Sequence, residues 1–251
     1  QTLQADTRGL AMKVLITNDD SISSPVLPHL AAWAKKLGEV TVMVPKVEQS
    51  GKSHGIELHK PFEVRQVELI PGVEAYTVDS TPADCVRYAV LGLQRQFDLV
   101  ISGINKGYNM GTDILYSGTA AGIFEAAILG IPAIALSTDP KTFDGALAQL
   151  DAVYDFFVQH DLMGKWSLYN VNFPPESKGI RITQQGGPLY SDDFPSIGNN
   201  LVMPTGKYVY ENRDDMTLDT DATLHGYISI TPLTIERTER TVFNALKHLN
   251  D

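Results

Sequence analysis

The chain has 251 residues, of which 43% are hydrophobic and 20% charged, and these proportions exclude a disordered or low-complexity protein. No stretch approaches the roughly 18 apolar residues of a membrane span, which excludes an integral membrane protein. The 20 Lys and Arg residues against 30 Asp and Glu give a net charge of −10, which argues against duplex nucleic acid or an anionic membrane as partner. The single cysteine, Cys85, permits no internal disulfide and favours a reducing compartment, so we expect a cytoplasmic protein.

Residues 1–11 lack the basic start and apolar stretch of a signal peptide, and we expect them to be a leader or a cloning remnant outside the fold. Short apolar strands then alternate with helices to about residue 180. Strands are expected at 13–17, 40–44, 62–69, 75–78, 97–104 and 131–137, and helices at 27–37, from 81 onward, at 118–129 and at 143–160. This alternation is typical of a catalytic α/β core, 12–180, with a parallel sheet covered by helices on both faces.

Residues 181–251 have a different pattern, with strands expected at 207–211 and 226–232 and a final helix at 236–249. We expect a β-rich extension that completes the domain and builds an oligomer interface. The acidic region with Asp214-Asp215 and residues 219–221 is expected to form a solvated loop or to become ordered at an interface.

Polar residues follow three of the predicted strands, and in an open parallel sheet ligands bind outside the carboxyl ends of the strands. Asp19 and Asp20 follow the first strand, and two adjacent carboxylates repel each other unless a cation lies between them. The Ser50 hydroxyl and the Asn105 carbonyl, which follow two other strands, are oxygen ligands that suit Mg²⁺ or Mn²⁺. The alternative is that Asp19 or Asp20 caps a helix or shapes a turn.

A glycine-rich segment, residues 102–119, ends in Ser117-Gly118-Thr119 directly before a helix. Free backbone N–H groups and the helix dipole at such a point form an anion site, to which Lys52 and Lys106 would add positive charge. The alternatives are plain helix capping and solvated lysines. Neither a P-loop motif nor a dinucleotide-binding glycine motif after the first strand is present.

Several other residues are open to two interpretations. His54 either donates a proton to a leaving oxygen or is a surface histidine, and Tyr108 and Tyr116 either flank a base or pack at the rim. Cys85 is expected in the core, and Asp84 in the first turn of a helix, where it interacts with the helix dipole or caps the helix.

Seven short motifs occur in order from residue 12 to near the C-terminus: ITNDD at 16–20, QSG at 49–51, STPADCV at 80–86, SGINKG at 102–107, YSGT at 116–119, NVNFP at 170–174 and GYISITPL at 226–233. Together they resemble the SurE family of survival proteins, which are metal-dependent 5′/3′-nucleotidases. The family usually has Gly at the position of Ser21, often a basic residue at Gln49, and often Glu-Gly at 125–126. These departures bear on substrate preference and rate.

The resemblance implies a Rossmann-like core, a C-terminal β extension used in homodimers or homotetramers, and hydrolysis of nucleoside 5′- and 3′-monophosphates to nucleoside and phosphate. In some relatives it also implies hydrolysis of short polyphosphate. It further implies one divalent metal ion, Mg²⁺ or Mn²⁺, per subunit. The expected metal ligands are Asp19, Asp20, Ser50 and Asn105, with Asp19 and Asp20 also catalytic, and the expected phosphate-binding residues are Asn18, Ser117, Gly118, Thr119 and Lys106.

Two alternatives of other classes stay open at this point. One is a non-catalytic, Mg²⁺-dependent phosphoryl-signalling module, because an acidic pair follows the first strand and Asp139 and Lys141 follow the strand at 131–137. The other is a nucleotide-binding protein without turnover. A covalent aspartyl-phosphate route is less favoured, because the second Asp that this route usually places two residues after the nucleophile is absent after Asp19.

Overall fold

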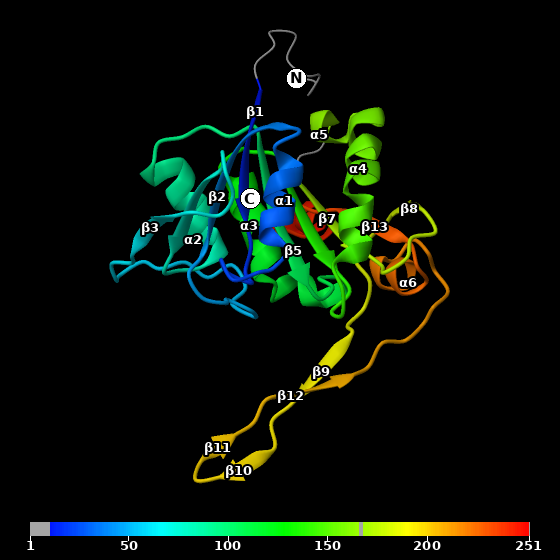
Figure 1. Ribbon diagram of the computed structural model, residues 1–251. Coiled ribbons are helices and arrows are strands. Elements are labelled where there is room, and N and C mark those ends of the chain that lie inside the picture. Colours follow the sequence, from blue (N-terminus) through cyan, green and yellow to red (C-terminus); the bar gives the residue numbers. More distant parts are fainter. Residues whose placement is uncertain (1–10, 166–167, 251) are drawn as a thin grey trace.

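The computed structural model describes residues 11–165 and 168–250. Residues 1–10 of the leader expected at 1–11 therefore lie outside the described residues. A nine-stranded sheet in the order β3-β4-β2-β1-β5-β6-β7-β13-β8 forms the centre of the molecule (Figure 1). Its strands are β1 (Met12–Thr17), β2 (Gly38–Pro45), β3 (Val64–Val67), β4 (Glu74–Val78), β5 (Leu99–Lys106), β6 (Ala133–Thr138), β7 (Leu168–Phe173), β8 (Ile180–Ile182) and β13 (Ile228–Pro232).

The sheet is mostly parallel, which confirms the predicted α/β fold class. The six strands from β4 to β7 in the sheet order run parallel. β3 pairs antiparallel with β4 at one edge, and β13 pairs antiparallel with β7 near the other. β8 and β13 belong to the predicted C-terminal extension, so this segment completes the central sheet.

Helices cover both faces of the sheet. They are α1 (Leu27–Ala34), α2 (Pro82–Arg87), α3 (Gly118–Ile128), α4 (Asp144–Gln159), α5 (Leu162–Lys165) and α6 (Asp219–Leu224), whereas α7 (Arg240–Leu246) is exposed along its whole length. Side chains alternate along a strand, so Ile16 of β1 packs in one core cluster with α1 and α4, and Leu15 packs in the other with α2 and α3. Within the described residues, no helix combines the length and apolar character needed to cross a bilayer.

The order β2-β1-β5 places three loops at one rim of the sheet. Ile16 lies opposite Val42 of β2, and Thr17 lies opposite Ser102 of β5. The residues that follow these strands therefore emerge side by side. This juxtaposition was expected from the parallel topology and is confirmed.

A β arm leaves the core at the carboxyl end of the strands and extends away from the sheet (Figure 1). In it, β9 (Tyr190–Asp193) pairs with β12 (Thr205–Tyr208), and β10 (Ser196–Gly198) pairs with β11 (Leu201–Val202). The strand predicted at 207–211 overlaps only the end of β12. Seven large apolar or aromatic side chains of the arm are each at least 50% exposed: Tyr190, Phe194, Ile197, Leu201, Val202, Met203 and Tyr208.

The expectation of a solvated acidic loop is wrong for Asp219 and Asp221, which are fully buried at the start of α6. Both carboxylates accept backbone N–H groups. Asp219 accepts that of Gly186 at 2.7 Å, and Asp221 accepts those of Arg213 and Asp215 at 3.0 Å each. These hydrogen bonds replace the water that a buried carboxylate loses.

Candidate active site

Asp19 lies just beyond the end of β1 against the N-terminus of α3, and its exposure is only 4%. The Thr119 hydroxyl donates a hydrogen bond of 2.5 Å to Asp19 Oδ1. Gly118 permits this close approach, because a Cβ at residue 118 would lie 2.8 Å from the Cβ of Asp19. Two residues expected to bind phosphate therefore lie where they orient the Asp19 carboxylate.

Asp20 is partly exposed, and its Oδ2 accepts the backbone N–H of Lys106 at 3.2 Å. Burial raises the pKa of Asp19, and the hydrogen bonds from Thr119 only partly offset this. Burial, and then the charge of Asp19, raise the pKa of Asp20 to about 6. The two neighbouring carboxylates are thus both destabilised as anions, which is the situation that a bound cation relieves.

Ser50 and Asn105 lie in the same cavity as Asp19, and this cavity has a volume of about 370 Å³. The Asn105 side-chain N–H donates to Gly107 O at 2.8 Å, which leaves the carbonyl oxygen of the amide as a free ligand atom. The Ser50 hydroxyl donates to Glu48 Oε1 at 2.6 Å and keeps its own lone pairs available. Glu48 was not expected at the site, although its position two residues before Ser50 is a signal for it.

The donor chemistry of these residues fits a hard divalent cation. Two carboxylates, an amide carbonyl and a hydroxyl provide oxygen ligands only. Across residues 11–165 and 168–250, no group of three or more His, Cys, Asp or Glu side chains gathers in the manner of a zinc site. The side-chain oxygen of Asn18, beside the carboxylates, is buried and lacks a hydrogen-bond partner among the described residues.

The turn between Asn18 and Ser21 is tight. Ser21 has a φ of 72°, in the left-handed region that favours glycine. The Asn18 side-chain N–H donates to Ser21 O at 2.9 Å and stabilises this turn. Asn18, expected to bind phosphate, thus uses its amide within the turn.

The remaining residues expected to bind phosphate lie at the cavity, where Ser117 and Lys106 both line it. The Ser117 hydroxyl accepts the backbone N–H of Ala120 at 3.0 Å, so it is the N-cap of α3. Lys106 is exposed and follows directly after Asn105.

Amide side chains from β7 hold the glycine-rich segment in place. Asn170 and Asn172 both donate to Asn109 O, at 2.6 and 3.1 Å, and Asn172 also accepts the Asn109 backbone N–H at 2.9 Å. The Asn109 side chain in turn donates to Ser137 Oγ at 2.9 Å. The NVNFP motif therefore supports the loop that carries one wall of the cavity.

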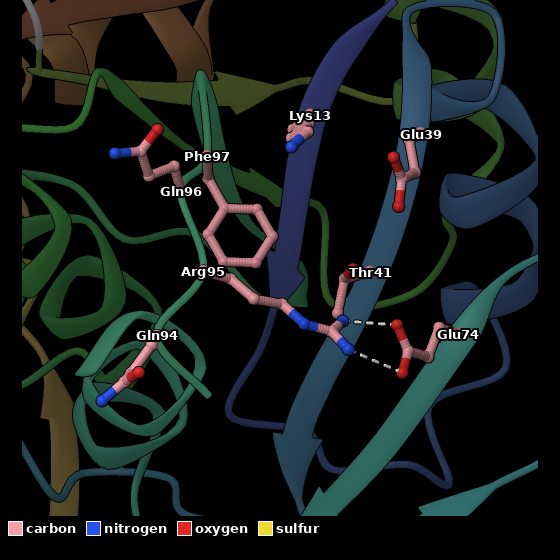
Figure 2. A pocket seen from close by; sticks show the side chains of 8 residues that line it. All are labelled: Lys13, Glu39, Thr41, Glu74, Gln94, Arg95, Gln96 and Phe97. Atoms are coloured by element: carbon pink, nitrogen blue, oxygen red, sulfur yellow. Dashed lines mark hydrogen bonds and ion pairs between the residues drawn. The ribbon is translucent and has the colours of Figure 1, made fainter. Parts of the chain in front are cut away.

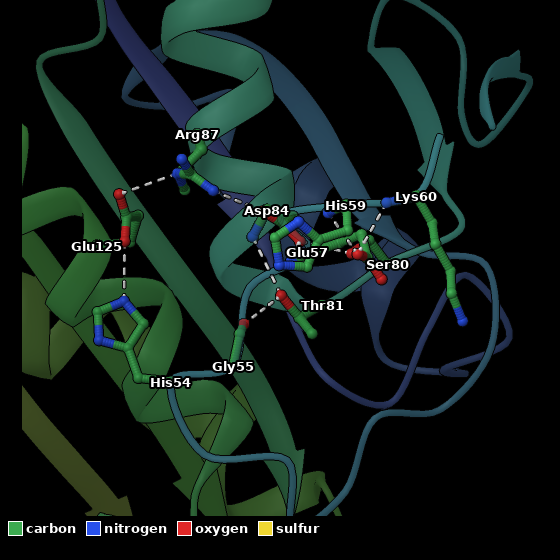
Figure 3. Close-up of polar contacts among 10 residues, drawn as sticks. All are labelled: His54, Gly55, Glu57, His59, Lys60, Ser80, Thr81, Asp84, Arg87 and Glu125. Carbon is green, nitrogen blue, oxygen red and sulfur yellow. Dashed lines mark hydrogen bonds and ion pairs between the residues drawn. The ribbon is translucent and has the colours of Figure 1, made fainter. Parts of the chain in front are cut away.

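The loop that carries Ser50 is attached to α2 and α3 by a network of charged side chains (Figure 3). His54 Nε2 lies 2.8 Å from Glu125 Oε2, and Arg87 lies between Glu125 and Asp84, at 3.7 and 3.0 Å. Asp84, which is 2% exposed, also accepts the backbone N–H of Glu57 at 2.7 Å. His54 is therefore part of the support of the loop.

Thr81 has the N-cap role at α2 that was predicted for it. Its hydroxyl oxygen accepts the backbone N–H of Asp84 at 3.2 Å, and its O–H group donates to Gly55 O at 2.7 Å. The cap thus also holds the Ser50 loop. Cys85, in the same helix, is fully buried in the core as expected.

The outer wall of the cavity is formed by Thr112, Asp113 and Tyr116, together with Tyr190 and Asp192 of the arm. The arm residues were not expected at the site, because nothing in the local sequence links positions 190–192 to the sheet rim. The other tyrosine considered at the sequence level, Tyr108, donates from its hydroxyl to Asp139 at 3.3 Å.

A second cavity, of about 480 Å³, lies at the opposite, amino ends of the strands (Figure 2). Lys13 and Glu39 face it from β1 and β2, and Arg95 forms a two-pronged ion pair with Glu74. Its charges are compensated internally. It is remote from the carboxyl-end rim where the predicted catalytic residues meet.

Comparisons with known proteins agree with the motifs. A sequence model of the family described as "Survival protein SurE" matches residues 14–192. A "5'-nucleotidase SurE" of Thermosipho melanesiensis is 36% identical over 250 residues, which cover 94% of this chain and 96% of that protein. A protein of the same name from Thermoanaerobacter sp. is 38% identical over 246 residues, which cover 94% and 97%.

The fold has a solved counterpart. The crystal structure of the SurE protein from Aquifex aeolicus matches with a TM-score of 0.76 and 32% identity, and the match covers 95% of this chain and 100% of that one. Taken with the match over residues 14–192, these relatives show that the chain belongs to the SurE family.

Proposed function

We propose that the chain is a divalent-metal-dependent phosphomonoesterase that hydrolyses nucleoside 5′- and 3′-monophosphates to nucleoside and phosphate. The supporting observation is that Asp19 after β1, Ser50 after β2 and Asn105 at the end of β5 line one cavity. Relatives at 36% and 38% identity over most of the chain carry the name 5′-nucleotidase.

One Mg²⁺ or Mn²⁺ ion is the proposed cofactor, held by the two carboxylates Asp19 and Asp20, the Ser50 hydroxyl and the Asn105 carbonyl. When bound, such an ion neutralises phosphate charge and acidifies a water molecule. It would also remove the mutual repulsion of Asp19 and Asp20, which raises the pKa of Asp20.

The chain itself supplies binding and proton transfer. Lys106 and the N-terminal region of α3 at Ser117 hold the phosphate oxygens, and Thr119 orients Asp19. Asp19 or Asp20, just beyond the end of β1, accepts a proton from the attacking water. The leaving nucleoside oxygen takes its proton from solvent, because His54 Nε2 faces Glu125.

The signalling alternative is not favoured. The family match and the relatives that cover most of the chain support an enzyme. Asp139, which would have to act with Lys141 in such a module, accepts the backbone N–H of Lys141 at 2.8 Å and the hydroxyl of Tyr108.

A phosphate-release assay with AMP and 3′-AMP tests the proposal. We expect turnover with Mn²⁺ or Mg²⁺, none in excess EDTA, and at least a hundredfold loss in Asp20→Asn. Asp139→Asn is the matched control and retains wild-type activity. Equal activity in EDTA, or full activity in Asp20→Asn, would contradict the proposal.

The arm supports a further part of the proposal, that the chain assembles as a homodimer or homotetramer through residues 181–251. Its exposed apolar side chains beyond the cavity form a surface that a second copy would cover: Phe194, Ile197, Leu201, Val202 and Met203. Light scattering on the wild type and on Ile197→Asp would test this, with dissociation expected in the variant. A cytoplasmic location, which the single cysteine favours, is likewise part of the proposal.

A further inference from the structure

The cavity at Asp19 is larger than a phosphate group requires. Its volume of about 370 Å³ lies in the range of sites for complete small molecules, whereas one water molecule occupies about 30 Å³ of liquid. The inner part is lined by the proposed metal ligands Asp19, Ser50 and Asn105 and by the proposed phosphate-binding residues Lys106 and Ser117. The outer part is lined by Thr112, Asp113, Tyr116, Tyr190 and Asp192, to which the proposed chemistry gives no role. This remaining space is available to the group that carries the phosphate.

Two tyrosines line this remaining part. Tyr116 comes from the chain just before α3 and is 63% exposed, and Tyr190 comes from β9 and is 54% exposed. Tyr190 is supported from one side by Tyr208, with ring centroids 5.6 Å apart in an edge arrangement. Exposed aromatic rings beside a phosphate site offer flat surfaces on which a base stacks.

Two carboxylates, Asp113 and Asp192, line the same part of the cavity. The pKa of Asp113 is raised, first by burial and then by the negative charge of Asp192, so the two groups interact. Among the described residues that line the cavity, Lys106 is the only cation, and it follows directly after the proposed ligand Asn105. The outer part of the cavity is therefore negatively charged.

The arm base is fixed relative to the glycine-rich loop. Asp219 accepts the N–H of Gly111 and also that of Gly186, four residues before Tyr190. These two segments of the chain approach so closely that a Cβ at Gly111 would lie 2.0 Å from Gly187 O. The segment that carries Tyr190 and Asp192 is thus held against the glycine-rich loop, which forms the neighbouring wall of the cavity.

We infer that the base of the arm is the nucleoside-binding wall of the active site, and that Asp113 and Asp192 select substrates that carry a single phosphate. This inference rests on the proposed function. The tyrosine rings contact the base, and the carboxylates accept hydrogen bonds from hydroxyl or amino groups of the nucleoside. The same carboxylates repel a second or third phosphate group, so nucleoside triphosphates and inorganic polyphosphates are poor substrates.

The test compares kcat/KM for AMP, ATP and glycerol 2-phosphate. In Tyr190→Ala we expect KM for AMP to rise about tenfold with kcat little changed, while glycerol 2-phosphate hydrolysis is unaffected and Tyr190→Phe resembles the wild type. In Asp192→Asn we expect the preference for AMP over ATP to fall about fivefold. Asp193→Asn is the matched control, because this neighbour on β9 does not line the cavity.

Salt provides a second measurement. The preference of the wild type for AMP over ATP should fall as ionic strength rises, and that of Asp192→Asn should change less. Two results, each with normal glycerol 2-phosphate hydrolysis, would overturn this inference and leave the proposed function standing. One is unchanged AMP kinetics in Tyr190→Ala, and the other is an unchanged preference for AMP over ATP in Asp192→Asn.

Calorimetric titration with AMP keeps the inference testable if no phosphomonoester is hydrolysed, an outcome that would count against the proposed function. Weaker AMP binding by Tyr190→Ala than by Tyr190→Phe would still support the nucleoside wall. Equal AMP binding by these two variants would overturn it.

Discussion

The carboxylate of Asp219 accepts the backbone N–H of Gly111 with both oxygens, at 3.0 and 3.1 Å, across 108 residues of sequence. It also accepts the N–H groups of Gly186 and Thr220 at 2.7 and 2.8 Å. A single buried side chain of the C-terminal segment thus joins the glycine-rich loop of the site to the base of the arm.

Asp219→Ala should destabilise the protein by about 3 kcal/mol, because the backbone N–H groups of Gly111, Gly186 and Thr220 lose their acceptor. Urea unfolding measures this change. Asp155→Ala, at an exposed position within α4, should change the free energy of unfolding by less than about 0.5 kcal/mol. Equal effects of the two substitutions would show that Asp219 has no special role in stability.

In EDTA, the free energy of unfolding should depend on pH through Asp19 and Asp20. The pKa of Asp20 is raised from 3.8 to about 6 and that of Asp19 is also raised, so the folded protein binds more protons than the unfolded chain between these pH values. Stability contributed by these groups is therefore lost as pH rises from about 4 to about 6.

Comparison with Asp20→Asn isolates this effect from other titrating groups. In EDTA the variant should gain stability relative to the wild type as pH rises through this range, and added Mn²⁺ should reverse the order at pH 7. A stability difference that is the same at pH 4 and pH 7 would contradict the electrostatic description of the pair.

His54 and Glu125 should act on the site through the Ser50 loop. Because Ser53, Gly55 and Glu57 also attach this loop to the core, His54→Asn should weaken Mn²⁺ binding only about tenfold. The pH–rate profile should keep its shape, since His54 Nε2 faces Glu125. His59→Asn, at an exposed position in the same loop, serves as the control. Loss of the basic limb of the profile in His54→Asn would instead indicate a general acid.

Much of the central sheet was predictable from the sequence, because its strands are short, apolar and separated by helices with clear end signals. The Thr81 cap and the helix stop at Gly130, whose φ is 76°, are examples. That Asp19, Ser50 and Asn105 lie together was also predictable, since parallel strands bring their carboxyl ends to one rim of the sheet.

The arm and its contribution to the site could not be predicted in the same way. β9 to β12 are two to four residues long and exposed, so they leave no burial pattern in the sequence. Asp219 resembles a solvated residue because its partners at Gly111 and Gly186 are distant in sequence. Such long-range pairing of a carboxylate with backbone N–H groups has no local signature.

The central claim is that one divalent cation joins the segments after β1 and β2 to the end of β5. Calorimetric titration of Mn²⁺ into the wild type, Asp20→Asn and Asp139→Asn tests it most directly. We predict one site per chain in the wild type and in Asp139→Asn, and at least a hundredfold weaker binding in Asp20→Asn. Absence of binding to the wild type, or equal affinity in all three proteins, would contradict the account.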